Sequence, residues 1–179
     1  LHGQRPVDAG RLAEEIAALI EDAPARAALA AKSRALVDGR GAMRVAAAIL
    51  PMHLREAAES DSAAAYDWRN APETRALSND PSPIERAGHE DWWSRALGNS
   101  ERHLLICEIG TRPVGVLRFD VEDSGEALVS IYFDPAMTGL GLGTRLLGAG
   151  RDWLTKSDPR AKQLVAEIDD SNHASLAIF

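Results

Sequence analysis

The chain has 179 residues and a formal net charge of −7 at pH 7, with 45% hydrophobic and 26% charged residues. The acidic balance argues against a nucleic-acid binder, which needs clustered Lys and Arg, and a single cysteine, Cys107, excludes an intrachain disulfide and fits a reducing cytosol. No apolar stretch approaches the length of a membrane span and no metal-ligand motif stands out, so we expect a metal-free cytoplasmic protein of one domain with an appendage.

The first 51 residues are rich in alanine and show helical periodicity. Apolar residues recur at helical spacing from residue 12 to residue 50, and breaks at Pro24 and at Gly39 to Gly41 divide the pattern into three short helices. Helices this short bury little area by themselves, so they must pack on something. We expect residues 1–51 to form a separate helical segment that is flexibly joined near Pro51.

Residues 52–179 alternate between strand and helix patterns. In chain order the expected elements are a strand at 52–57, helices at 61–70 and 83–97, strands at 103–109, 113–121 and 127–133, a helix after the loop at 139–143, a strand at 163–168 and a helix beginning at 172. Short turns join the three central strands into an antiparallel meander. The expected fold class is α+β, a mixed and mostly antiparallel sheet flanked by helices.

The most informative stretch begins at Phe133 and reads FDPAMTGLGLGTRLL. A strand ends, glycines follow at alternate positions, and an amphipathic helix begins, which makes a cradle for a pyrophosphate at a helix N-terminus. A dinucleotide fingerprint would need a third glycine where Thr144 stands, and a P-loop would need a lysine after its last glycine.

The spacing instead resembles the coenzyme A loop of the GNAT superfamily of N-acetyltransferases, and the order of elements from Met52 to Phe179 is that of the GNAT fold. Thr138 stands where the family usually has Gln or Arg. The resemblance implies acetyl-CoA as cosubstrate and a fourth strand that parts from its neighbour to pair with the pantetheine arm. It assigns donor binding to Ile131, Tyr132, Phe133, Thr138, Gly139, Leu140, Gly141, Leu142, Gly143, Thr144 and Asn172.

The same resemblance indicates the catalytic residues less clearly than the donor-binding residues. Glu126 lies near where several GNATs place a general base, although a solvated turn glutamate is the competing interpretation, and Asn172 is equally expected as a helix cap. The general acid is often a tyrosine seven residues after that asparagine, but this chain has Phe179 there. GNAT domains usually add two further strands, so the resemblance implies a C-terminally truncated domain.

Two further resemblances narrow the acceptor. Trp68, Arg69, Asn70, Arg75, His89 and Trp93 resemble a GNAT branch that acetylates nucleotide-linked amino sugars, in which Arg would grip a phosphate and Trp would stack on a ring. Residues 36–45 resemble the C-terminal end of the UDP-sugar hydrolase of pseudaminic acid biosynthesis. Together they imply an acetyltransferase for a nucleotide-linked 4-amino-4,6-dideoxy sugar, fused to an upstream hydrolase.

Other interpretations stay open. The tryptophans are equally explained as core residues. The chain could acetylate a protein N-terminus or a small amine, or bind acyl-CoA without turnover. A homodimer and a monomer are equally compatible with the sequence.

Overall fold

A computed structural model describes residues 8–179, which divide into two compact units, one ending at Ala42 and the other beginning at Met43. Within residues 8–179, no helix is long and apolar enough to cross a membrane. The same residues contain no group of three or more His, Cys, Asp or Glu side chains that could hold a metal ion.

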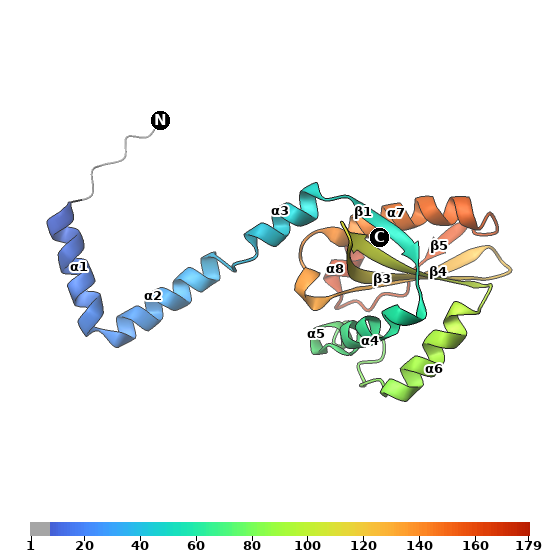
Figure 1. The fold of residues 1–179 in the computed structure, drawn as a ribbon, viewed down its shortest axis with the longest axis horizontal. Helices are drawn as coiled ribbons and strands as arrows, with labels where there is room; N and C mark the ends of the chain where they lie inside the picture. Colours follow the sequence, from blue (N-terminus) through green and yellow to red (C-terminus); the bar gives the residue numbers. More distant parts are fainter. Residues whose placement is uncertain (1–7) are drawn as a thin grey trace. The chain divides into compact units, whose positions relative to one another are not determined.

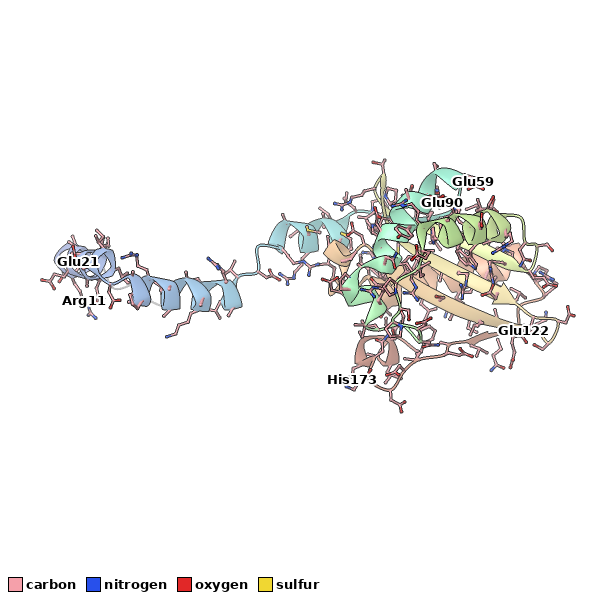
Figure 2. All side chains as sticks on the ribbon, turned by 90° about the horizontal axis from the view of Figure 1, so that it is seen from below. Arg11, Glu21, Glu59, Glu90, Glu122 and His173 are labelled. Carbon is pink, nitrogen blue, oxygen red and sulfur yellow. The ribbon has the colours of Figure 1, made fainter. Side chains whose placement is uncertain are left out.

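The first unit contains α1 (Ala9–Glu21) and α2 (Ala23–Leu36), which bury no residue. Each helix begins with an aspartate cap: the side chain of Asp8 accepts from the N–H groups at positions 10 and 11, and that of Asp22 from Ala25 N. Nη1 of Arg26 donates to the carbonyls of residues 19 and 20, both at 2.6 Å, and so neutralises the C-terminal end of α1. Figure 2 shows the side chains of both helices pointing into solvent, with Arg11 and Glu21 labelled on α1.

The third helix, α3 (Gly41–Ile49), crosses the boundary between the units, and most of it belongs to the second. Ala47 is only 2% exposed and joins the main apolar core, with Met43 packed against that core. The compact second unit therefore begins at Met43, nine residues before the domain that the sequence predicts from residue 52.

The second unit is built on a five-stranded sheet in the order β1-β2-β3-β4-β5. Its strands are β1 (Met52–Glu56), β2 (Arg102–Ile109), β3 (Arg112–Val121), β4 (Glu126–Phe133) and β5 (Gln163–Val165). The first four strands pair antiparallel and β5 is parallel to β4. The predicted mixed, mostly antiparallel sheet is confirmed.

Helices cover both faces of this sheet, α7 (Leu142–Ser157) on one side and α4 (Ser62–Asn70), α5 (Pro72–Arg75) and α6 (Arg86–Leu97) on the other (Figure 1). Two apolar clusters correspond to the two faces. The larger includes Leu117, Phe119 and Leu146. The smaller includes Trp93 and Val116. From Val116 onward the side chains of β3 follow the period of two that a strand imposes, with Val116 in the smaller cluster and Leu117, Phe119 and Val121 in the larger.

Two expected elements are shorter than their patterns indicated. The helix expected from Pro83 begins at Arg86, because Ile84 N donates to the side chain of Asn70, which holds this stretch as a loop. The strand expected over 163–168 ends at Val165, where the pairing with β4 also ends. The last helix, α8, covers His173–Leu176.

A stripe of residues spaced by four on α7 faces the sheet: Leu142, Leu146, Gly150 and Leu154 are buried. At Gly150 the helix comes so close that an added Cβ would lie 2.3 Å from Cδ2 of Leu117 and 3.1 Å from Cζ of Phe119. Glycine is therefore required here by space, whereas Gly148 on the same helix faces nothing within 4 Å.

We expect Gly150→Ala to lower the free energy of unfolding by about 1–3 kcal/mol through overpacking. Gly148→Ala is the matched control, since it changes helix propensity equally and should stabilise by about 1 kcal/mol. Urea unfolding of both variants measures the difference. Equal stability of the two variants would show that α7 does not rest on Leu117 as described.

Candidate functional site

The loop after β4 is fixed at its start by Asp134. Its Oδ1 accepts from Ala136 N at 2.9 Å, and its Oδ2 accepts from Nη2 of Arg112 at 2.8 Å. A short 3₁₀ turn (Pro135–Met137) follows, and Met137 is 6% exposed and belongs to the main core. The chain therefore enters the glycines from an anchored position.

The glycines at 139 and 141 have left-handed backbone conformations, with φ of +76° and +72°. A Cβ at either would meet no protein atom within 4 Å, so both open onto free space. Gly141 is the N-cap of α7 and offers no side chain to the helix. The N–H groups of the first turn, which include those of Leu142, Gly143 and Thr144, have no acceptor inside the helix and can bind an anion.

Gly143 serves a different purpose from the two open glycines. A Cβ there would lie 2.4 Å from Cδ1 of Ile178, so the first turn of α7 packs directly against the end of the chain. Thr138 donates its backbone N–H to Pro135 O at 3.2 Å, and Leu140 packs against the main core. The structure thus brings together the loop residues that the sequence indicated.

The fourth strand has a free edge next to this loop. Its pairing with β5 joins only residues 126–128 to 163–165, while Ile131, Tyr132 and Phe133 pair with β3 alone among the described residues. At the last of these, Gly115 of β3 makes room for Phe133, since a Cβ at Gly115 would lie 2.6 Å from Cδ1 of that ring. The expected parting of β4 from its neighbour is therefore present, and its free edge leads to the glycines.

Asn172 adopts its capping role in this structure. Its Oδ1 accepts from Ser175 N at 3.0 Å, and its Nδ2 donates to Leu77 O at 3.3 Å. The side chain thus caps α8 and ties it to the loop after α5.

Three of the residues expected to bind the acceptor hold the fold instead. His89 and Trp93 are 4% and 0% exposed, with His89 Nε2–H donating to Ser62 O at 3.1 Å and Trp93 Nε1–H to Ala58 O at 3.1 Å. Asn70 uses its whole amide on Ile84, accepting from its N–H at 2.9 Å and donating to its carbonyl at 2.8 Å. These three side chains therefore have structural roles here, because their polar atoms are bound to the backbone.

Arg75 and Trp68 also have structural partners. Arg75 donates from Nε to Asn70 O at 3.1 Å and from Nη1 to Pro81 O at 2.9 Å, which closes the loop around α5. Trp68 packs against the smaller core. Arg69 differs from both, as its Nη2 lies 3.4 Å from Asp80 O and its buried Nη1 has no hydrogen-bond partner within the described part of the chain.

Sequence reasoning missed a cationic neighbour of Arg69 on the sheet. Arg118 of β3 interacts electrostatically with Arg69, as do Arg75 and Tyr132. Its Nε lies 2.9 Å from Oδ2 of Asp120. The one signal in the sequence was a charged residue within the otherwise apolar stretch 114–119.

Glu126 is not brought to this site. It is exposed in the first position of β4, and its carbonyl accepts from Glu122 N at 2.8 Å. Ile131 lies five positions further along the strand, which is a distance of about 17 Å. Figure 2 shows Glu122 at the opposite end of the unit from His173 of α8. Glu126 therefore stands at the wrong end of β4 for direct proton transfer beside the glycines.

A parted parallel strand pair, a glycine loop and a helix N-terminus together define an acyltransferase that holds its donor by a pyrophosphate. The chain belongs to the acetyltransferase (GNAT) domain family, whose model matches residues 52–179. It is an acetyl-CoA-dependent N-acetyltransferase. No curated relative matches the chain.

Solved structures share the fold. An aminoglycoside acetyltransferase, AAC(6')-Ib, in complex with coenzyme A and kanamycin, is 20% identical, with a TM-score of 0.63 over 72% of this chain and 80% of that chain. The spermidine N-acetyltransferase of Vibrio cholerae with coenzyme A and spermine is 12% identical, with a TM-score of 0.63 over 71% and 76%. RimL, a ribosomal L7/L12 alpha-N-protein acetyltransferase with coenzyme A, is 18% identical, with a TM-score of 0.61 over 71% and 76%.

The residues present fit acetyl-CoA, which supplies an activated acetyl thioester when bound. The open space at Gly139 and Gly141 and the uncapped N–H groups after them suit its pyrophosphate, and the free edge of β4 suits an amide-bearing arm.

We expect Gly141→Ala to weaken coenzyme A binding about ten- to a hundredfold, because the new Cβ fills the cradle and costs charge-assisted contacts. Gly39→Ala is the matched control, since Gly39 has the same φ of +72° and equally open surroundings. The strain of about 1–2 kcal/mol is common to both variants. Isothermal calorimetry compares them, and equal affinities for coenzyme A would contradict the cradle.

The structural role of His89 predicts a pH dependence of stability. Burial lowers the pKa of His89 below its ordinary 6.5, with the Ser62 carbonyl opposing the shift. Between the two values the unfolded chain binds more protons, so stability should fall as pH falls below about 6.5 and level off below the folded pKa. We expect His89→Gln to flatten this part of the profile in urea unfolding. An unchanged slope would contradict the burial of a neutral imidazole.

Proposed function

We propose that this acetyltransferase acts on the amino group of a phosphate-bearing acceptor, namely a nucleotide-linked 4-amino-4,6-dideoxy sugar. The observation that carries the proposal is the buried Nη1 of Arg69, which has no hydrogen-bond partner within the described residues. A buried guanidinium N–H without an acceptor is costly, and an anionic oxygen of a ligand would satisfy it.

The electrostatic surroundings of Arg69 support an anionic partner. Burial lowers its pKa, Tyr132 and Asp80 oppose this shift, and the neighbouring Arg118 and Arg75 lower the pKa further. The Asp80 carboxylate is itself engaged by Ser82 N at 2.9 Å. A phosphate close to these cations would be attracted electrostatically, and a further cation would be repelled.

The surroundings of Tyr132 agree with this assignment. Burial raises the pKa of its hydroxyl well above the ordinary value, although Arg69 and Arg118 oppose the shift. The phenol therefore keeps its proton at neutral pH. It can offer a hydrogen bond to an acceptor oxygen but adds no negative charge that would compete with phosphate.

The same charges weigh against a polycationic acceptor. Kanamycin and spermine, which are bound in two of the structures of similar fold, carry several ammonium groups. A site next to Arg69 and Arg118 would repel such molecules. The acceptor would be held by its phosphate, which leaves its neutral amine to meet the acetyl group beside β4.

We also propose that the helical segment expected at residues 1–51 contains the tail of a fused sugar-nucleotide hydrolase, and that this tail ends with the first unit at Ala42. The support is that α1 and α2 bury no residue and form a unit of their own. Several exposed apolar side chains on them, Leu12, Ile16, Ile20, Leu29 and Leu36, suit a surface that an adjoining domain would cover.

We expect Arg69→Ala to raise the acceptor KM about ten- to a hundredfold and to leave donor affinity nearly unchanged. Arg69→Lys should restore only part of the affinity, because an ammonium cannot replace a planar guanidinium. Arg86→Ala is the control: Arg86 lies on the neighbouring helix, paired at the surface with Asp67 at 3.5 Å. Steady-state kinetics with a UDP-linked 4-amino sugar give these constants.

The choice of acceptor is tested on the same protein with a panel. A nucleotide-linked amino sugar should be preferred over the free sugar, spermidine, kanamycin and a peptide N-terminus. Equal turnover of the nucleotide-linked and free sugars would defeat the phosphate assignment, and preference for the peptide would favour the protein N-terminus. Coenzyme A binding without turnover of any amine would indicate a binding module.

A further inference from the structure

We infer that α3, which lies before the matched GNAT domain, is a working part of the donor site, and that Arg145 is the positioning residue that joins them. This inference concerns how the coenzyme A loop is held. It rests on the assignment of that loop and is independent of which amine is acetylated.

Arg145 connects the first turns of α7 to the end of α3. It lies three residues after Leu142, the first residue of α7. Its Nη1 donates to Ala47 O and its Nη2 lies 3.4 Å from Leu50 O. These carbonyls stand at the C-terminal end of α3, where the last carbonyls have no N–H donor within the helix and carry partial negative charge. A single guanidinium thus contacts two carbonyls at that helix end.

Apolar packing joins the same elements. Ala47 is 2% exposed and shares one buried cluster with Met137 and Leu142, the residues that flank the glycines on either side. Leu140, between the two open glycines, packs against this cluster, and so does Met43 of α3. Met43 and Ala47 of α3 therefore belong to the same apolar core as the residues around the glycine loop.

The contact between Arg145 and α3 should affect the affinity for coenzyme A. Gly139 and Gly141 have no side chains with which to hold their own conformation, and ordering a residue costs about 1–2 kcal/mol. A loop already held in its binding conformation avoids that cost when the donor arrives. Removing the Arg145 contact should therefore loosen the loop in the free protein and weaken donor binding, even though the Arg145 guanidinium is bonded to backbone carbonyls.

The inference is tested in the full chain with Arg145→Met, which keeps the length of the side chain and removes its donors. We expect the coenzyme A dissociation constant from calorimetry to rise about tenfold, or about 1.4 kcal/mol. Amide hydrogen exchange of residues 139–144 should become faster in the free protein. Arg145→Lys should recover part of both effects. Acceptor KM at saturating acetyl-CoA should be unchanged.

The control is Arg151→Met on the same helix. Arg151 is 67% exposed and pairs with the adjacent Asp152 at 3.0 Å, so its loss should change neither readout. A second variant, Ala47→Leu, disturbs the contact from the α3 side and should reproduce the faster exchange.

Two results would overturn the inference. Unchanged coenzyme A affinity in Arg145→Met, even with a lower melting temperature, would leave Arg145 with a purely structural role. Weaker binding without faster exchange of the loop would mean that Arg145 contacts the donor directly.

Discussion

The structure depends on the point at which β5 leaves β4. Over residues 126–128 the fourth strand has neighbours on both sides, and after Leu128 it pairs, within residues 8–179, with β3 alone. An unpaired strand edge inside a protein has backbone groups that need partners, and here the edge leads to the glycine loop and the N-terminus of α7. A ligand with an amide-bearing arm and an anionic end would satisfy both features. The parting of two strands thus determines where the donor can lie.

The two faces of the sheet are covered by different helices and lined by different side chains. Residues of β3 and β4 alternate, so that Leu117 and Phe119 face α7 while Val116 and Tyr132 face α4 and α6. On the α7 side a close approach at Gly150 fixes the helix that carries the donor loop. On the other side the orphan N–H of Arg69 lies next to Tyr132 and Arg118. The donor loop thus belongs to one face of the sheet, and Arg69, which we propose to bind the acceptor, belongs to the other.

The sequence was sufficient for features that depend on neighbours along the chain. The three-strand meander, the loop at 139–143 and the cap at Asn172 follow from local patterns, and the GNAT fold is confirmed. Roles set by distant partners could not be found in this way. His89 and Trp93 bind carbonyls 27 and 35 residues away, and nothing in their spacing of four residues separates a core pair from a binding pair. For Glu126, the sequence indicates a position at the start of a strand but not its distance from the glycine loop.

The boundary at residue 43 could not be read from local patterns either. Alanine-rich periodicity is similar in all three, yet only α3 meets the core, through Ala47 and the Arg145 contact. The local pattern describes an amphipathic helix and does not say what covers it. α2 leads into α3 through the left-handed Gly39, so the helix that follows this turn is also the one whose C-terminal end is bound by Arg145.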